Sequence, residues 1–219
     1  MFDAHLQPLL RRAFEPSAKR LVAIGVSADA ITLAGFGFGA LSAAALAFGR
    51  TDAALALILL NRLADGLDGA VARLAGPTDR GAFLDIALDF FFYALVPFGF
   101  ALADPARNAL AASALLLAFV GTGSSFLAFA AVSAPSGRRA RDYSNKGLYY
   151  LGGLTEGAET IALFVAMCLW PVAFPALAYA FAVLCFATTL MRWRWGWEAF
   201  SPPPQTSAID LRKTRENIT

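Results

Sequence analysis

The stretch from Asp65 to Asp89, DGLDGAVARLAGPTDRGAFLDIALD, places five carboxylates between two long apolar runs. Asp65 and Asp68 are three residues apart, and Asp85 and Asp89 are four apart. Residues at these spacings lie on one face of an α-helix. The stretch therefore predicts two helices, each with a carboxylate pair on one face, joined by a short link that contains Gly and Pro.

The composition of the whole chain is that of a membrane protein. Of its 219 residues, 58% are hydrophobic and 16% are charged, and the mean hydropathy is +0.58. Soluble domains are about 45–50% apolar and about 25% charged. The formal net charge is only +2, so we expect no nucleic-acid partner.

Six apolar runs are long enough to cross a bilayer, which takes about 20 residues each. Every break between them contains Gly, Pro or charged residues, which end helices. We therefore predict an all-α integral membrane domain over residues 23–197, with six transmembrane helices. The runs cover about 28–48, 53–75, 81–103, 108–134, 148–169 and 172–191.

The two ends of the chain are polar enough to lie outside the bilayer. Residues 1–22 repeat apolar side chains at helical spacing beside basic residues, which predicts an amphipathic helix on the cytoplasmic membrane surface. A partly ordered tail is the alternative for this segment. Residues 198–219 are polar and Pro-rich, and we expect a flexible tail there.

Basic residues indicate which side of the membrane each loop faces. With six spans, Lys and Arg gather in the N-terminal segment, the loops at 75–80 and 136–147, and the C-terminal tail. The opposite loops contain only Arg50 and Arg107. The positive-inside rule then places both termini and the Asp-rich loop in the cytoplasm, in a bacterial-type inner or plasma membrane.

The two carboxylate pairs should meet, because a short link makes their helices antiparallel neighbours. One charged side chain at the centre of a bilayer costs about 2.5–3.5 kcal/mol on insertion scales, so either some carboxylates are protonated or cations neutralise them. Oxygen ligands favour Mg²⁺, Mn²⁺ or Ca²⁺, and four carboxylates could hold two such ions. Two ions suit in-line substitution at phosphorus. A membrane ion carrier is the alternative, since Asp clusters within membranes also mark ion pathways.

The same residues form a longer pattern, D-x-x-D-G-x-x-A-R…G-x-x-x-D-x-x-x-D, which resembles the signature of the CDP-alcohol phosphotransferases (the CDP-alcohol phosphatidyltransferase family). Seven residues separate the Arg from the second Gly, one fewer than expected. An ion path does not need the D-G-x-x-A-R spacing, and the presence of all four Asp disfavours an inactive scaffold. The matching residues are Asp65, Asp68, Gly69, Ala72, Arg73, Gly81, Asp85 and Asp89.

The resemblance implies a homodimer with a two-metal site in a cavity open to the cytoplasm and to lipid. It implies that Asp65, Asp68 and Asp85 hold two Mg²⁺ or Mn²⁺ ions, and that Asp89 also faces the metals and takes the proton of the attacking alcohol. The implied reaction transfers a substituted phosphate from CDP-diacylglycerol, or another CDP-alcohol, to a small alcohol and releases CMP. The implied CDP pocket contains Asp68, Gly69, Ala72, Arg73 and Thr32, although Thr32 could instead cap its helix.

The acceptor alcohol stays open, with two groups of candidate residues. The basic residues of the loop at 136–147 either follow the positive-inside rule and attract anionic lipid headgroups, or bind a phosphorylated acceptor. The candidates in this loop are Arg138, Arg139, Arg141 and Lys146. Glu156 and Glu159 are predicted one turn into the fifth helix, and acids inside a membrane span are functional candidates. They could bind inositol or another polyol, or an ammonium group such as that of serine, ethanolamine or choline. The alternative is that they form ion pairs with the basic loop. Arg192, alternating with nearby Trp residues, is interpreted as an interface anchor.

Overall fold

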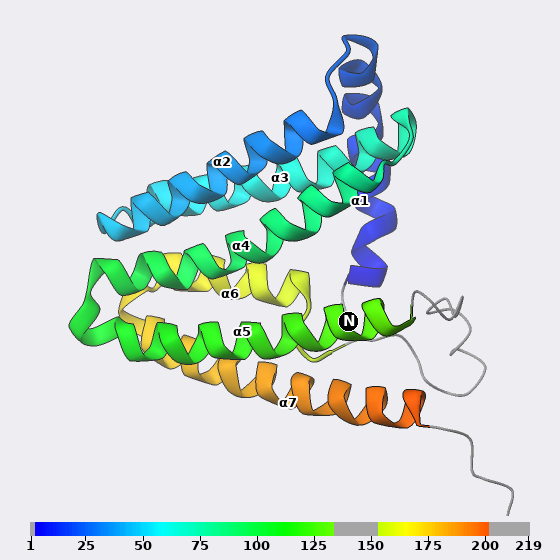
Figure 1. Ribbon diagram of the computed structural model, residues 1–219. Helices are drawn as coiled ribbons and strands as arrows, with labels where there is room; N and C mark the ends of the chain where they lie inside the picture. Colours follow the sequence, from blue (N-terminus) through cyan, green and yellow to red (C-terminus); the bar gives the residue numbers. More distant parts are fainter. Residues whose placement is uncertain (1–2, 134–152, 202–219) are drawn as a thin grey trace, which may run out of the picture.

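The computed structural model of the protein describes residues 3–133 and 153–201, and these residues form helices joined by short links (Figure 1). In chain order the helices are α1 (Asp3–Ala23), α2 (Ala28–Ala47), α3 (Thr51–Ala75), α4 (Asp79–Ala103), α5 (Pro105–Ser133), α6 (Gly157–Leu169), the 3₁₀ turn η2 (Pro171–Ala173) and α7 (Phe174–Phe200).

The helices from α2 to α7 run back and forth along one common direction. In Figure 1 the α2–α3 and α4–α5 links lie at the left end, and the α3–α4 link lies at the right end. α2 packs against α3 and α4, α4 packs against α5, and α5 packs against α7. α6 contacts α3 and α7, and so it joins the two halves of the bundle.

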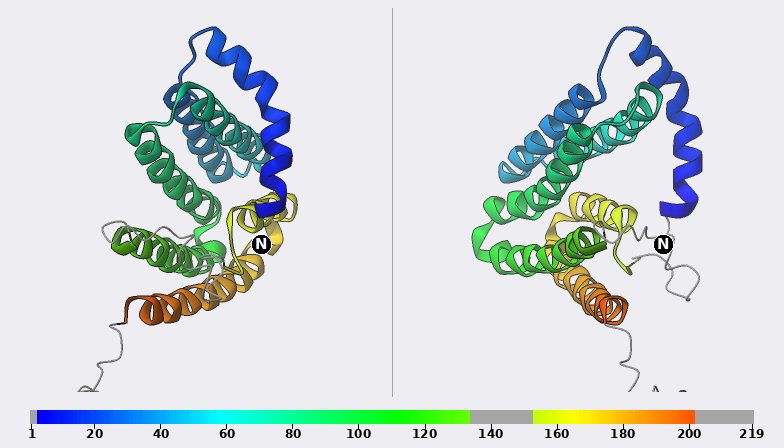
Figure 2. Two further views of the ribbon diagram at one scale, coloured as in Figure 1. Left: turned by 90° about the vertical axis from the view of Figure 1, so that its right-hand side faces the viewer. Right: turned by 45° about the vertical axis from the view of Figure 1, so that its right-hand side comes forward.

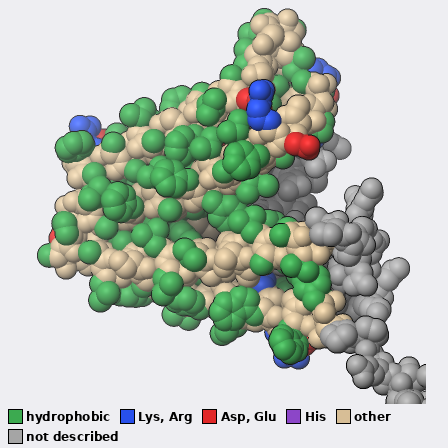
Figure 3. Space-filling model, viewed as in Figure 1, with side chains coloured by type: hydrophobic (Ala, Val, Ile, Leu, Met, Phe, Trp, Pro, Cys, Tyr) green, Lys and Arg blue, Asp and Glu red, His purple; other side chains and the backbone are tan. Residues whose placement is uncertain are grey.

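Four described segments are long and apolar enough to span a membrane: Ala28–Ala47, Asp79–Ala103, Pro105–Ser133 and Pro171–Phe200. α3 has 25 residues but includes five charged ones. α6 has only 13 residues, or roughly 20 Å at 1.5 Å per residue. Apolar side chains cover the middle of the face in Figure 3, and charged ones lie at its margins. The described residues thus form an all-α fold with four membrane-spanning candidates.

Local signals in the sequence explain where the site helices begin and end. The Ser27 hydroxyl accepts a hydrogen bond from the Ala30 amide and caps α2, and the Thr78 hydroxyl caps α4 through the Gly81 amide. Gly76 ends α3 with φ of +100°, a conformation that favours glycine. Because Ser27 is the cap of α2, the alternative reading of Thr32 as a helix cap is wrong.

Glycines let α2 approach both of its neighbours closely. A Cβ atom added at Gly35 would lie 2.8 Å from the Ala64 Cβ of α3. One added at Gly39 would lie 2.6 Å from the Phe92 ring of α4. Gly35 and Gly39 form a G-x-x-x-G pair, the small-residue pattern by which membrane helices pack.

The fifth predicted membrane helix corresponds to α6 and begins later than the sequence predicts. Within the described residues it starts at Gly157, so Glu156 and Glu159 do not lie one turn inside it. Glu156 is the N-cap, and the Glu159 carboxylate accepts a hydrogen bond from the Glu156 amide at 3.1 Å in a capping box. Two acids at this spacing fit a capping box, which the apolar run around them concealed.

α1 is a helix, as predicted, and it crosses the direction of the others (Figure 2). Its Ala18 is fully buried, and its Phe14 ring fills the space beside Gly66 of α3. An apolar face of α1 therefore packs on the helix that carries Asp65 and Asp68. That the rest of α1 lies on a membrane surface remains a prediction.

Arg192 is not an interface anchor. α7 continues to Phe200, past the predicted end of the sixth run, and Arg192 is only 9% exposed on it. Its Nη1 donates to the Thr122 carbonyl oxygen of α5 at 2.9 Å. The neighbouring Trp193 and Trp197 are exposed, so the helix turns the arginine inward and these Trp residues outward.

Candidate active site

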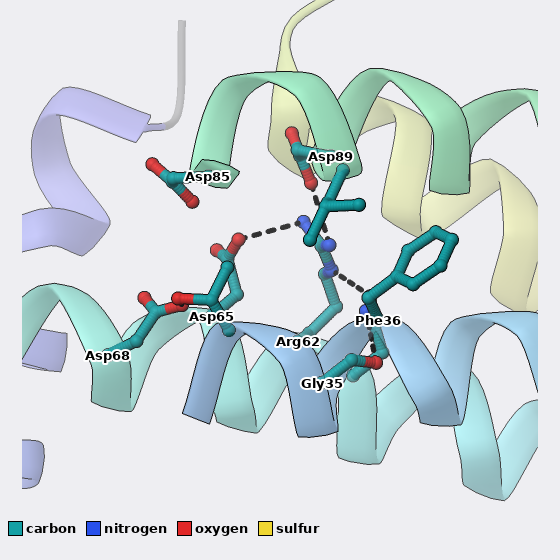
Figure 4. Close-up of a pocket in the computed structure, with 10 residues that line it drawn as sticks. Gly35, Phe36, Arg62, Asp65, Asp68, Asp85 and Asp89 are labelled. Carbon is teal, nitrogen blue, oxygen red and sulfur yellow. Dashed lines mark hydrogen bonds and ion pairs between the residues drawn. The ribbon is translucent and has the colours of Figure 1, made fainter. Parts of the chain in front are cut away.

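The structure brings the two carboxylate pairs together around one small pocket of about 20 Å³ (Figure 4). Asp65 and Asp68 enter from α3, and Asp85 and Asp89 enter from α4. The pairs meet because the chain turns between the two helices at Gly76 and Thr78, and because α2 packs against both helices. The remaining lining residues are Thr32, Gly35, Phe36, Asn61, Arg62 and Leu88.

Arg62 extends between the carboxylates from one turn before Asp65. Its Nη2 donates to Asp89 Oδ1 at 2.7 Å, and its Nη1 lies 3.7 Å from Asp65 Oδ1 (Figure 4). Its Nε donates to Asn61 Oδ1 at 2.8 Å. The pocket therefore holds a positive charge among its acids.

Thr32 connects α2 to the pocket. Its hydroxyl donates to Asp68 Oδ2 at 2.6 Å and also lies 3.0 Å from the Ala28 carbonyl oxygen. Asp68 is only 5% exposed. A buried carboxylate is costly without partners, and Thr32 supplies one from the neighbouring helix.

A second, larger cavity of about 830 Å³ adjoins the small pocket and shares its four carboxylates. One wall is apolar and comes from α4 and α5, including Phe90, Leu116 and Val120, and Figure 3 shows the surface hollowed between these helices. The other wall is polar and is lined by Thr122, Thr155, Glu156, Thr160 and Arg192. The larger cavity thus contains both apolar and polar lining residues besides the four carboxylates.

The other predicted site residues lie at differing distances from these cavities. Gly69 lines the larger cavity, whereas Ala72 is half-buried, Arg73 is exposed, and neither lines either cavity. Glu156 lines the larger cavity and Glu159 does not. The basic candidates Arg138, Arg139, Arg141 and Lys146 lie outside the described residues.

Sequence reasoning missed two arginines that line the cavities. Arg62 interrupts the apolar run 53–75, and a charged residue within a predicted span is a functional candidate by default. That signal could have identified it. Arg192 alternates with Trp residues in the sequence, a pattern typical of an exposed membrane interface. Only the packing of α7 on α5 shows that Arg192 faces inward.

The residues suit a hard divalent cation by their chemistry. Four carboxylates from two facing helices form an all-oxygen donor set without His or Cys. Among the described residues, no three acidic side chains are close enough to hold a single ion together. An ion held by three of these carboxylates at once therefore requires side-chain rotations that draw them together, whereas one or two carboxylates with water or phosphate oxygens can hold an ion without them.

The sequence model of CDP-alcohol phosphatidyltransferases matches residues 26–193, which include α2 to α6, most of α7 and every carboxylate of the pocket. The chain belongs to the CDP-alcohol phosphatidyltransferase family. It is therefore a membrane-associated transferase of phospholipid biosynthesis. The resemblance read from the eight signature positions is confirmed.

One relative of this CDP-alcohol phosphatidyltransferase matches most of its length, and another matches a shorter part. The inner membrane protein YnjF of Escherichia coli (strain K12) is 54% identical over 192 residues, covering 88% of this chain and 93% of the relative. The archaetidylinositol phosphate synthase of Methanothermobacter thermautotrophicus is 42% identical over 84 residues, covering 38% of this chain and 42% of the relative. The four long apolar helices, together with the name of the first relative, indicate an integral membrane protein.

Solved structures share the fold of this CDP-alcohol phosphatidyltransferase. The phosphatidylinositol phosphate synthase PgsA1 of Mycobacterium tuberculosis, with CDP-DAG bound, aligns with a TM-score of 0.65 and 23% identity. The alignment covers 88% of this chain and 98% of that structure. The same enzyme in complex with manganese and citrate gives a TM-score of 0.64 at 24% identity, covering 87% and 93% of the two chains. At these identities the likeness concerns the fold.

Proposed function

We propose that this protein transfers a phosphatidyl group from CDP-diacylglycerol to the hydroxyl of a small alcohol and releases CMP. The alcohol oxygen forms a bond to the phosphorus that carries the diacylglycerol. The bond from that phosphorus to the bridging pyrophosphate oxygen breaks, and CMP leaves with the electron pair. The observation that carries the proposal is the meeting of the four signature carboxylates at a cavity that is lined by both apolar and polar side chains.

Each carboxylate has a role in this proposal. Asp65, Asp68 and Asp85 hold two Mg²⁺ or Mn²⁺ ions, with Asp89 beside them. When bound, the ions would neutralise charge on the pyrophosphate and on the leaving CMP. Asp89 accepts the proton of the alcohol, a contribution of about 10²–10⁴-fold for a positioned base. The manganese complex of PgsA1 supports a divalent ion.

The two walls of the larger cavity suit the two substrates. The α4–α5 wall, which includes Phe90 and Val120, offers an apolar path along which acyl chains can lie while the nucleotide reaches Gly69. Asp68 and Thr32 border this nucleotide side, and Ala72 and Arg73 follow one turn further along α3. The CDP-DAG bound in PgsA1 supports a donor of this kind.

The polar wall faces the acceptor in this proposal. Thr122, Thr155 and Thr160 offer hydroxyls, Glu156 a carboxylate and Arg192 a guanidinium. Such a wall suits a polyol, with or without a phosphate. Glu159 is assigned to the helix cap, and the basic loop around Arg138 stays a candidate for a phosphorylated acceptor.

The same proposal includes the topology. Six passages, α2 to α7, alternate in direction (Figure 1), which supports six membrane crossings even though α3 is charged and α6 is short. Arg20, Arg73 and Arg80 lie at the end of the bundle that holds the carboxylates, whereas Arg50 and Arg107 lie at the other end. The positive-inside rule then gives a cytoplasmic site and cytoplasmic termini. A homodimer follows from the resemblance alone.

The test is CMP release by the purified protein with CDP-diacylglycerol, a panel of alcohols, and Mg²⁺ or Mn²⁺. We expect one alcohol class to give CMP, EDTA to stop the reaction and added Mn²⁺ to restore it. Asp89→Asn should lower the rate by about 10²-fold or more, because the proton acceptor is lost. Glu156→Gln should raise the KM for the alcohol and leave the KM for the donor unchanged.

Three outcomes would count against this function. The mechanism would be contradicted if none of the alcohols in the panel gave metal-dependent CMP release. An unchanged rate in Asp89→Asn would also contradict it. If reconstituted vesicles showed cation flux that needs the four Asp while CMP release was absent, the ion-carrier alternative would replace it.

A further inference from the structure

Thr188 is a fully buried residue in the middle of the long apolar helix α7. Its hydroxyl donates to the Leu184 carbonyl oxygen of the same helix at 3.0 Å, which is a common partner for a threonine inside a helix. A hydroxyl has one proton and two acceptor lone pairs. The bond to Leu184 uses the proton and leaves both lone pairs of Thr188 available for other donors.

Both lone pairs are taken by the short segment that leads into α6. The Leu154 amide donates to Thr188 Oγ1 at 3.1 Å, and the Thr155 hydroxyl donates to the same atom at 3.2 Å. The segment lies close against α7, because a Cβ atom added at Gly153 would clash with Cγ2 of Thr188. Thr188 therefore makes every hydrogen bond that its hydroxyl allows, and most of them hold this segment.

The segment that Thr188 holds carries part of the polar wall of the larger cavity. Thr155 and Glu156 line that cavity, whereas Thr188 does not. The Gly153 amide donates to Glu156 Oε1 at 3.2 Å, so the segment closes on the carboxylate at the start of α6. A shift of the segment away from α7 would therefore move Thr155 and Glu156 together.

We propose that Thr188 is a positioning residue that sets the place of the acceptor alcohol through Thr155 and Glu156. The inference rests on the proposed function, which assigns the polar wall to the acceptor, and it adds a residue that touches neither substrate. The metal-binding carboxylates and the nucleotide side at Gly69 belong to α3 and α4. Thr188 should therefore affect binding of the alcohol and leave binding of the donor unchanged.

Thr188→Val in the purified full chain tests the assignment, because it keeps the shape of the side chain and removes the hydroxyl. The Leu154 amide and the Thr155 hydroxyl then lose their acceptor. With CDP-diacylglycerol, Mn²⁺ and the alcohol that supports CMP release, the KM for the alcohol should rise about tenfold. The KM for the donor and kcat at saturating alcohol should stay within about twofold of the wild-type values. A merely structural role would raise both KM values or lower kcat.

Thr189→Val is the matched control, one residue further along α7. Thr189 is also buried, but its hydroxyl donates to the Cys185 carbonyl oxygen of its own helix at 2.8 Å, and its side chain packs beside Gly121 of α5. Removal of this hydroxyl should change neither KM. Thr188→Ser keeps the hydroxyl at the tested position, and its KM for the alcohol should stay close to the wild-type value.

Gly153→Ala disturbs the same contact from the opposite side. Its methyl group would press on Cγ2 of Thr188, so the segment should shift and the KM for the alcohol should rise about tenfold. Thr188→Ser removes that Cγ2. In the double variant Gly153→Ala/Thr188→Ser, the KM for the alcohol should return to within about threefold of the wild-type value. Without this rescue, the contact between Gly153 and Thr188 would not explain the effect, and the inference would fail.

Hydrogen exchange in detergent provides a measurement that needs no turnover. Exchange of the peptide containing the Leu154 amide should become about tenfold faster in Thr188→Val and stay unchanged in Thr189→Val. An unchanged KM for the alcohol, or unchanged exchange at Leu154, in a folded Thr188→Val protein would overturn the inference. If the wild-type protein released CMP with no alcohol, the proposed function would fall, and with it the role of Thr188 toward the acceptor, whatever the exchange at Leu154.

Discussion

At the residue scale, the hydroxyl of Thr32 is the contact through which α2 reaches the carboxylates. Thr32→Val keeps the side-chain shape and removes the donor to Asp68. A hydrogen bond to a charged group contributes about 1.5–3 kcal/mol, so CMP release at limiting Mn²⁺ should fall about tenfold or more. The measurement is the rate as a function of Mn²⁺ concentration.

Thr32→Ser is the matched control, because it keeps the hydroxyl and loses only a methyl group. We expect it to retain most of the rate. If the Val and Ser variants were equally slow, the packing of the methyl group would explain the loss, and the hydrogen bond to Asp68 would not.

The position of a single side chain was predictable where its spacing along one helix determines the face on which it lies. The intervals among the four signature Asp give their helical faces. The expectation that the short Gly-Pro link makes α3 and α4 direct neighbours is wrong, because α2 packs against both helices and joins them. The partners of those Asp were not predictable: Thr32 lies 36 residues before Asp68, and Arg62 lies 27 residues before Asp89. Such contacts depend on how α2, α3 and α4 pack, which spacing within one helix does not encode.

At the element scale, the approach of α2 to α4 depends on Gly39. Gly39→Ala would place a methyl group against the buried Phe92 ring that supports Arg62. Overpacking of this kind costs about 1–3 kcal/mol, so the free energy of unfolding should fall by that amount. Unfolding in mixed detergent, followed by circular dichroism, measures it.

Gly37 offers a matched control in the same helix. A Cβ atom added there meets nothing within 4 Å, so Gly37→Ala should leave stability unchanged or raise it slightly. Equal losses in the two variants would show that helix flexibility, and not the contact with Phe92, determines the effect.

The elements themselves were largely predictable, since apolar runs bounded by Gly, Pro and charge correspond to α2, α4, α5 and α7. α6 was not, because apolar residues continue on both sides of its first turn and hide the capping box at Glu156. The start of that helix depends on the segment before it, whose Leu154 amide donates to Thr188 of α7 at 3.1 Å. No local pattern in the sequence reveals a contact made over such a separation.

At the scale of the whole molecule, the prediction concerns which side of the membrane each end of the bundle faces. The two native cysteines, Cys168 and Cys185, are buried, so a single cysteine introduced at the surface should dominate labelling. Asp79→Cys lies at the carboxylate end of the bundle and Arg50→Cys at the other end. A membrane-impermeant maleimide should label Arg50→Cys in intact cells, and Asp79→Cys only in inverted vesicles. The reverse pattern would place the site outside the cytoplasm.

The short link between α3 and α4 also has a consequence for biogenesis. All four acids and Arg62 belong to α3 and α4, which follow one another in the chain, and α2, which packs against both helices, comes before them. We expect the translocon to receive these two segments as a pair, with the arginine and the acids screening one another as they leave the aqueous channel. Together with α2, these segments would carry their charges into the bilayer before the rest of the bundle is synthesised.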